Sequence, residues 1–431
     1  MLKPAEAEVS LLQPARLEGL FSPLDTFASI GIAVSGGPDS LALMAMLARW
    51  AATRPHRPTL TVFTVDHGLR PEAKDEAALV VRCAETLGLE AIVLEWHGEK
   101  PVSGLQAAAR AARYRLIGEV MDWRDIGVLL TAHHMDDQAE TILMRIAHGS
   151  GVTGSAGMSQ WSEVEGVKVF RPLLATRRRE LEEVIAAVGW RAASDPTNTD
   201  PAFERVRWRA AMPQLEALGL TVERLAQFGT RLARADRALA EFAARAYEAI
   251  LHVDPLGTAR LNRAALLDQP DGVQLRVLAR IIDEAGGAAR APDLSQVEAL
   301  DAAIKSGAAL AGTTVGGCRI LVVGDDIVIA REPGRLPVET LTLRPGGNLV
   351  WDKRFEISSR PDAPVLVISP AGKIPRAELA ALVGERPLGP DAPLGAPQIN
   401  AEGRLMALGA VSFDSRLSVA LTYGPGKAAK H

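Results

Sequence analysis

Cysteines and long apolar runs are scarce in this chain. Only two cysteines, Cys83 and Cys318, occur among 431 residues, which excludes a disulfide framework and favours a reducing cytosol. No stretch approaches about 18 uninterrupted apolar residues, so a membrane-spanning helix is excluded. The first 20 residues contain no continuous apolar segment, and we therefore expect no secretory signal peptide. The sequence predicts a cytoplasmic protein without membrane association.

A basic overall charge and a Walker A motif are absent as well. Lys and Arg number 48 against 52 Asp and Glu, a formal net charge of -4, so contact with nucleic acid must use local patches. The pattern GxxxxGK[ST] occurs nowhere, which excludes an ordinary P-loop nucleotide site. The chain is 48% apolar and 23% charged, which is typical of a globular protein.

The first half of the chain alternates short apolar runs with segments of helical composition. This alternation predicts an α/β fold, a doubly wound parallel five-stranded sheet covered by helices on both faces. The expected strands are residues 30–34, 60–65, 91–94, 126–131 and 167–170.

The character of the sequence changes near Pro213. Helix formers with apolar residues at a spacing near 3.6 dominate the next segment, and short β runs punctuated by Pro and Gly begin near Gly316. We expect four parts: an N-terminal extension (1–27), the α/β catalytic domain (28–213), a helical domain (214–315) and a small β-rich C-terminal module (316–431).

One Gly-rich turn after the first expected strand carries the strongest chemical signal. Its glycines permit a sharp turn, and the helix that follows adds unpaired N–H groups, so the turn can bind phosphate. Asp39 would repel phosphate unless a cation bridges them, and Mg²⁺ is the natural bridge. The alternative is an ordinary turn whose Asp and Ser cap the helix. The turn, called the 35–40 loop below, is Ser35-Gly36-Gly37-Pro38-Asp39-Ser40.

Polar residues also follow the second and fourth expected strands. Asp66 and His67 end the second, and His133 and His134 end the fourth. In an open parallel sheet, ligands bind beyond the carboxyl ends of the strands where the strand order switches. These residues can therefore meet the 35–40 loop, Asp66 and His67 at the nucleotide and the histidines where charge develops. Polar loops and structural histidines are the alternative interpretation.

Three acids begin the next expected helix. Asp136 and Glu140 share a helical face, whereas Asp137 points about 100° away. One face can hold Mg²⁺ or the ammonium of an amino acid, and we expect Asp39 and Asp136 to be the metal ligands. Acids also favour a first helical turn through the helix dipole. That simpler explanation is weaker for three acids beside two histidines.

Three basic clusters are candidates for anion binding. Arg110 and Arg113 share a helical face and can clamp a substrate phosphate. Arg177-Arg178-Arg179 opens a helix, an unfavourable place for cations that favours an anionic partner. Arg205 and Arg209 share another face, and an RNA backbone suits all five of the later arginines. A solvated helix face is the alternative for each cluster.

Together these motifs resemble a known enzyme superfamily. The 35–40 loop is similar to the pyrophosphate loop of the N-type ATP pyrophosphatases, the PP-loop superfamily. With segments 65–70 and 132–141 in this order, the sequence resembles the tRNA(Ile)-lysidine synthetase family over residues 30–212. The loop Asp195-Pro196-Thr197-Asn198 is similar too, although Thr197 replaces the usual Ser. Val206 replaces the usual Asn, so we leave it out of the site.

The resemblance implies an ATP-dependent ligase that joins lysine to the wobble cytidine of an isoleucine tRNA with a CAU anticodon. ATP would adenylate the base carbonyl and release pyrophosphate. The amine of free L-lysine would then attack the same carbon and release AMP. ATP and Mg²⁺ are the implied cofactors. The oligomeric state stays open, with a homodimer among the alternatives.

The motifs and the resemblance together give three groups of expected site residues. The catalytic group is Asp39, Arg110, Arg113, His133, His134, Asp136, Asp137 and Glu140. The ATP-binding group is Ser35, Gly36, Gly37, Pro38, Asp39, Ser40, Asp66 and His67. The tRNA-binding group is Arg177, Arg178, Arg179, Arg205 and Arg209. The general base is left open among His133, His134, Asp136 and Asp137.

Three other functions fit the sequence less well. Thiolation of tRNA generally needs paired cysteines, but Cys83 and Cys318 lie far apart and no CxxC occurs. An ammonia-using synthetase leaves the arginines at 177–179 and the C-terminal parts unexplained. A non-catalytic RNA-binding protein conflicts with the intact Asp39 and the adjacent acids at 136 and 137.

Overall fold

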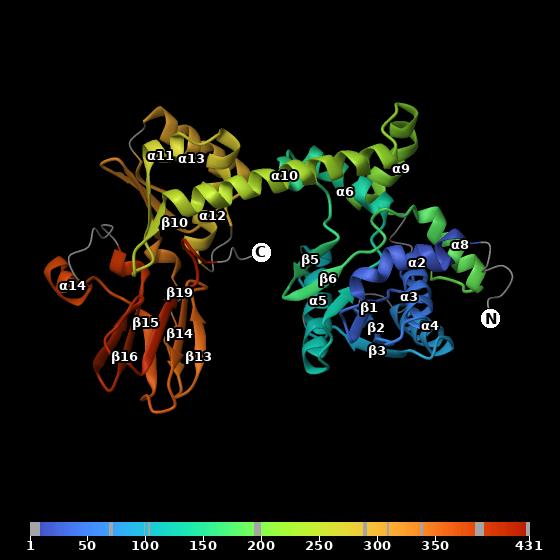
Figure 1. Ribbon diagram of the computed structural model, residues 1–431, viewed down its shortest axis with the longest axis horizontal. Coiled ribbons are helices and arrows are strands. Elements are labelled where there is room, and N and C mark those ends of the chain that lie inside the picture. The colour runs from blue at the N-terminus through green and yellow to red at the C-terminus, as the bar shows by residue number, and fades with distance from the viewer. Residues whose placement is uncertain are drawn as a thin grey trace. The chain divides into compact units, whose positions relative to one another are not determined.

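The computed structural model falls into two compact units, Met1–Arg234 and Ala235–His431 (Figure 1). The residues that it describes are 9–68, 72–98, 100–101, 104–193, 200–287, 291–307, 310–336, 339–383 and 392–427. Two sequence motifs fall partly or wholly outside them: positions 69 and 70 after the second strand, and the loop Asp195-Pro196-Thr197-Asn198. No helix in the described part of the chain is long and apolar enough to cross a membrane.

A six-stranded sheet of order β3-β2-β1-β4-β6-β5 forms the centre of the first unit. Its five parallel strands confirm the five expected from the sequence. They are β1 (Ser29–Ala33), β2 (Thr59–Asp66), β3 (Glu90–Glu95), β4 (Val128–Leu130) and β6 (Val167–Phe170). The switch in strand order lies between β1 and β4, because the chain runs from β1 out to β3 before it returns to β4.

The sixth strand, β5 (Trp161–Val164), was not expected from the sequence. It pairs antiparallel with β6. A two-residue turn joins the two strands, with positive φ angles of 50° at Glu165 and 78° at Gly166, the conformation that tight hairpins require. Its residues, Trp-Ser-Glu-Val, form no continuous apolar run, so the edge strand carries no signal of burial.

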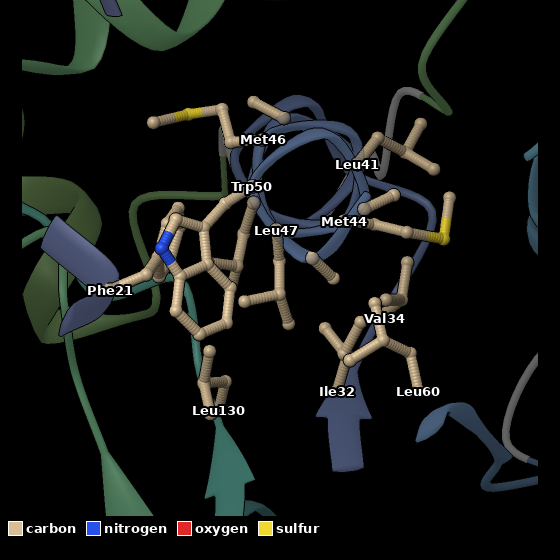
Figure 2. Packing of buried hydrophobic residues seen from close by; sticks show 14 of the residues in the cluster. Phe21, Ile32, Val34, Leu41, Met44, Met46, Leu47, Trp50, Leu60 and Leu130 are labelled. Carbon is tan, nitrogen blue, oxygen red and sulfur yellow. The ribbon is translucent and has the colours of Figure 1, made fainter. Parts of the chain in front are cut away.

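Helices cover both faces of this sheet (Figure 1). On one face, Leu47 and Trp50 point toward Ile32 and Leu130 (Figure 2). On the other face, α5 buries Ile117 against the strands. The helices of this unit are α2 (Pro14–Phe21), α3 (Pro38–Ala51), α4 (Ala73–Thr86), α5 (Leu105–Trp123), α6 (Met135–Ala147), α7 (Val152–Ser155), α8 (Arg178–Val188) and α9 (Glu204–Ala217).

Strand β1 shows how the two faces are packed. Ile30 and Ile32 are fully buried in the cluster beneath α3, while Gly31 between them points to the other face. A Cβ at Gly31 would lie only 2.9 Å from the ring of Phe63. The glycine therefore lets the Phe63 ring pack directly on the strand that leads into the 35–40 loop.

The long helix α10 (Val222–Ile250) begins in the first unit and continues into the second. In the second unit, helices and strands share one apolar core that includes Tyr247, Leu278, Ile281 and Ile329. The helices are α11 (Arg263–Leu267), α12 (Asp271–Ala285) and α13 (Leu294–Ser306). The sheet is β7 (Leu251–Val253), β8 (Ala259–Asn262), β11 (Asp326–Arg331), β10 (Cys318–Val323) and β9 (Ala311–Val315).

The rest of the second unit is β-rich, as the sequence predicts. Two antiparallel sheets share a core that contains Trp351, Phe355 and Ile368. Their strands are β12 (Leu341–Leu343), β13 (Asn348–Trp351), β14 (Phe355–Ser359), β15 (Leu366–Pro370), β16 (Pro397–Ala401), β17 (Arg404–Leu408), β18 (Val411–Ser412) and β19 (Leu417–Leu421), with the helix α14 (Arg376–Val383). The four-part division expected from the sequence stays a prediction; its 315/316 boundary falls between the paired strands β9 and β10.

Candidate active site

The 35–40 loop closes on itself through Ser40. The loop turns at Gly36, where φ is +84°, and Gly37 caps α3, whose first residue is Pro38. The Ser40 hydroxyl donates to the carbonyl of Gly37 at 3.1 Å and accepts from the Ser35 N–H at 3.1 Å. The loop shape is therefore held by its own hydroxyl, and it presents the N-terminus of α3 to a ligand.

Asp39 has an unsatisfied carboxylate oxygen. Its Oδ1 is buried and has no hydrogen-bond partner among the described residues, and its Oδ2 lies 3.6 Å from Nε2 of His134. A buried, unpaired carboxylate oxygen is costly, and a bound cation would remove that cost. No cluster of three or more His, Cys, Asp or Glu poised for a metal occurs in the described chain. Mg²⁺ does not require one, since it takes one or two carboxylates together with phosphate oxygens.

His134 connects the 35–40 loop to α6. It caps α6 reciprocally with Asp137: the His134 N–H donates to Asp137 Oδ2 at 3.0 Å, and the Asp137 N–H donates to His134 Nδ1 at 3.3 Å. Nε2 lies 3.5 Å from Asp137 Oδ2 and faces Asp39. Burial opposes a charge on this ring, but Asp39, Asp137 and Asp136 together raise the pKa of His134. The structure thus places the expected residues Asp39, His134 and Asp137 in one cluster.

Asp136 is bound by the start of α8. Its Oδ2 accepts from the Arg178 N–H at 2.9 Å and from Arg177 Nε at 3.3 Å, and its Oδ1 accepts from Arg177 Nη2 at 3.3 Å. Arg177 also pairs with Glu223. Three N–H donors at one carboxylate compete with a metal ion, so Asp136 fits Mg²⁺ less well than Asp39 does.

Glu140 is enclosed by two arginines of α9. Its side chain is 4% exposed, and it pairs with Arg205 at 3.2 Å and with Arg209 at 2.8 Å. Burial opposes the charge of Arg209, but Glu140, Asp137 and Asp39 raise its pKa. Two residues expected to touch RNA therefore also belong to the electrostatic surroundings of the acidic cluster.

A second group of residues in the site consists of arginines and two histidines that are neutral near pH 7. Burial, with Arg171, Arg110 and Arg205, lowers the pKa of His133 to about 4, and His133 Nδ1 lies 2.9 Å from the Thr131 hydroxyl. Burial and Arg113 lower the pKa of His67 to about 4, and Arg113 lies 3.2 Å from His67 Nε2. Neither imidazole is a cation near neutral pH.

Arg171 is a site residue to which sequence reasoning gave no role. It is 4% exposed, and its Nη1 donates to the carbonyl of Ser159 at 2.9 Å and to the Ser162 hydroxyl at 2.8 Å. Its charge acts on His133. The strand before it, β6, is buried except at Lys168, but an isolated Arg after a strand is ordinarily exposed, so the sequence gives little sign that Arg171 is buried.

In the part of the chain that the structure describes, the remaining residues expected in the site form no hydrogen bond or ion pair with Asp39, His134 or Asp137. Asp66 accepts from the Gly68 N–H at 2.7 Å and so shapes the turn after β2. Arg110 is exposed and lies over the Tyr114 ring. Arg178 pairs with Glu182 at 3.2 Å, and Arg179 is exposed. Within the described residues, no hydrogen bond or ion pair joins His67 or Arg113 to Asp39.

The two neutral histidines predict a pH dependence of stability. Between pH 6.5 and about 4 the unfolded chain takes up protons at His67 and His133 that the folded chain does not. The free energy of unfolding should therefore fall as the pH drops through this range, by at most about 3 kcal/mol from His133. Denaturant titrations of the wild type and His133→Gln at pH 7 and pH 5 measure it. An equal loss in both proteins would contradict the neutral state of His133.

Comparison with known proteins identifies the family. A family model described as a PP-loop domain matches residues 11–215. The tRNA(Ile)-lysidine synthase of Rhodopseudomonas palustris is 41% identical over 327 residues, which cover 73% of this chain and 94% of that protein. The tRNA(Ile)-lysidine synthase of a Methylobacterium species is 44% identical over 313 residues, 70% of this chain and 89% of that one. A solved U34-tRNA thiolase from Methanococcus maripaludis is 18% identical, with a TM-score of 0.43 over 50% of this chain and 77% of its own. At the identity and coverage of the two synthases, the chain belongs to the tRNA(Ile)-lysidine synthase family.

Proposed function

We propose that this protein uses ATP to join free L-lysine to the wobble cytidine of the CAU anticodon of isoleucine tRNA. The observation that carries the proposal is the unpaired buried oxygen of Asp39 inside a phosphate-binding loop, with His134 and Asp137 beside it. A phosphate loop alone would suit many ATP enzymes. Family membership supplies the tRNA and lysine of this reaction.

In the first step, the base carbonyl oxygen attacks the α-phosphorus of ATP and pyrophosphate leaves. The N–H groups at the start of α3 would bind the phosphates, and Asp39 would hold Mg²⁺, which offsets charge on the leaving group. Arg110 and Arg113 would stabilise the charge that develops on the transferred phosphate. His133 stays neutral and so offers a hydrogen bond there without adding charge.

In the second step, one amine of lysine, in its neutral form, attacks the carbon that bears the adenylate. AMP leaves with the electrons of the broken C–O bond, and the attacking nitrogen gives up a proton to the general base. An acid must hold the other amine, which stays an ammonium. Asp136 and Glu140 are each paired with arginines, whereas Asp137 forms no ion pair or hydrogen bond with an arginine in the described structure. Asp137 is therefore the acid we assign to the ammonium of lysine.

Exposure separates the five arginines expected to contact RNA. The side chains of Arg178 and Arg205 are 38% and 44% exposed, and Arg179 is exposed too. Arg177 is more enclosed, at 20%, and contacts two carboxylates. Arg209, at 35%, pairs with the buried Glu140 at 2.8 Å, a shorter contact than that of Arg205. RNA phosphate contact is therefore proposed most directly for Arg178, Arg179 and Arg205. With tRNA and ATP as substrates, we expect the protein in the cytoplasm, and a homodimer remains an open proposal.

The two cysteines are poorly suited to the alternative of tRNA thiolation. Both are buried. Burial raises the pKa of the Cys83 thiol and raises that of Cys318 to about 12. A thiol held protonated and away from solvent is a poor sulfur carrier.

Labelled lysine tests the proposed function. The protein is incubated with ATP, Mg²⁺, labelled lysine and either isoleucine tRNA with a CAU anticodon or methionine tRNA. We expect label in the isoleucine tRNA alone, at a single anticodon nucleoside in a nuclease digest. Label in neither tRNA, or loss of label when unlabelled ammonia is added in competition with the labelled lysine, would favour a different ligase reaction.

A further inference from the structure

Arg177 forms a bridge between three helices of the first unit. Its Nε and Nη2 hold both oxygens of Asp136 on α6, each at 3.3 Å, and its Nη1 pairs with Glu223 in the first turn of α10. Arg177 itself caps α8, and its N–H donates to Glu180 at 2.8 Å. One planar guanidinium therefore contacts two carboxylates from different helices.

The carboxylate that Arg177 holds belongs to the turn that carries the site. Asp136 lies between His134 and Asp137, which cap α6. The same turn is fixed to residues 176–178, at the start of α8, by two hydrogen bonds: the Met135 N–H donates to the Thr176 carbonyl at 2.8 Å, and the Arg178 N–H donates to Asp136 Oδ2 at 2.9 Å. A movement of this segment would therefore move His134 relative to Asp39.

The start of α10 packs closely on α6. Val222 and Leu225 share a buried apolar cluster with Ala139 and Leu143 of α6. At Gly229, a Cβ would lie 2.6 Å from the Ile142 side chain, so the two helices approach closely. The Arg177–Glu223 pair thus lies beside an apolar contact that already joins the two helices.

The surroundings of Arg177 differ from those of an RNA-binding arginine. Its side chain is 20% exposed. Burial opposes its charge, but Glu223 and Asp136 together raise its pKa, so the charge is already matched by carboxylates. An RNA phosphate would have to displace one of them. The helix dipole disfavours a cation at this position, and the acids at 136, 180 and 223 remove that cost without RNA.

We propose that Arg177 is a positioning residue for adenylation: held by Glu223, it fixes Asp136 and thereby the cap residues His134 and Asp137 opposite Asp39. The inference rests on the proposed function, because adenylation is the step it serves. This positioning role requires the forked N–H donors of a guanidinium. Lysine would keep the positive charge but could not hold both oxygens of Asp136 while it contacts Glu223.

Arg177→Lys separates positioning from RNA binding. Turnover is measured as pyrophosphate release at saturating tRNA, and tRNA affinity is measured from 50 to 200 mM salt. We expect kcat to fall about tenfold or more, as misplaced groups cost up to about 10²-fold, with the KM for ATP and the salt dependence unchanged. Glu223→Gln, at a carboxylate that is 53% exposed, should fold normally and lower kcat severalfold.

Two control variants calibrate the measurements. Arg115→Lys alters an exposed pair with Glu119 on α5 and should change neither quantity. Arg179→Gln, on the adjacent exposed residue, should reduce the log–log salt slope by roughly 0.7–0.9, the value for one lost phosphate contact.

The inference is overturned if Arg177→Lys and Glu223→Gln both keep wild-type kcat. It is equally overturned if Arg177→Gln lowers the salt slope like Arg179→Gln while Arg177→Lys retains full turnover, because Arg177 would then be a phosphate ligand. Failure of the proposed function looks different: the wild-type protein itself would show no tRNA-dependent pyrophosphate release.

Discussion

Asp39→Asn should lower tRNA-dependent pyrophosphate release by at least about 10²–10³-fold, the usual cost of one preorganised electrostatic contact. Asn has the shape of Asp but no charge, so it can fill the same place in the first turn of α3 without holding Mg²⁺ against the phosphates. The oxygen that would bind the metal is Oδ1, which is buried and unpartnered. The loss should appear in the rate constant of the adenylation step, measured as pyrophosphate release in a single turnover.

A matched control residue lies on α4, the next helix along the chain. Asp75 lies in the first turn of α4, as Asp39 lies in the first turn of α3, but it is exposed. Asp75→Asn should leave pyrophosphate release unchanged. Asp39→Asn should fold with undiminished thermal stability, because it removes a partly buried charge, one oxygen of which is buried without a partner. Near-normal release by a folded Asp39→Asn protein would refute the metal role.

A fragment that ends at Arg234 should bind ATP and Mg²⁺ but lose nearly all lysidine formation on intact tRNA. Every proposed catalytic group lies in the first compact unit, which ends at that residue. A shorter fragment ending at Gln214 would lack Val222 and Leu225, which cover the apolar face of α6. We expect a loss of about 10³-fold or more, since correct placement of reactants is worth up to ~7–11 kcal/mol.

The substrate itself supplies the control for this truncation. On a short anticodon stem–loop, the fragment and the full chain should work at similar, low rates, because the rest of the tRNA is missing for both. ATP binding, measured by calorimetry, should be the same in the two proteins. Full turnover by the fragment on intact tRNA would place tRNA selection in the arginines of the first unit.

The parallel sheet could be predicted from the sequence because its strands are short, largely apolar runs that alternate with segments of helical composition. The strands β1, β2 and β4 are buried along most of their length, whereas the edge strand β3 is partly exposed. Strand β5 could not, since a hairpin turn and not burial defines it. Within the second unit, the helices and strands share one core, and a local change in periodicity does not reveal packing between distant segments. Asp352, held by the fully buried Arg331 and Arg354, likewise resembles an ordinary surface residue in sequence.

The grouping of the 35–40 loop with His134 and Asp137 could be predicted, because parallel strands bring their carboxyl ends to one edge. The pairing of individual charges could not. Asp136 and Glu140 share a helical face in the sequence. Arg177, which caps α8, nevertheless pairs with the first, and Arg209 of α9 pairs with the second, 41 and 69 residues away. The sequence showed charged residue types but not which opposite charges would neutralise them.

The central claim is that ATP activates the tRNA and lysine completes the reaction, and separate detection of the two products tests it most directly. Pyrophosphate and AMP are followed with ATP alone, with tRNA added, and with tRNA and lysine. The account predicts pyrophosphate only when isoleucine tRNA is present, about one equivalent per site without lysine, and AMP release with continued turnover once lysine is added. Pyrophosphate release that is independent of tRNA, or AMP release driven by ammonia in place of lysine, would contradict it.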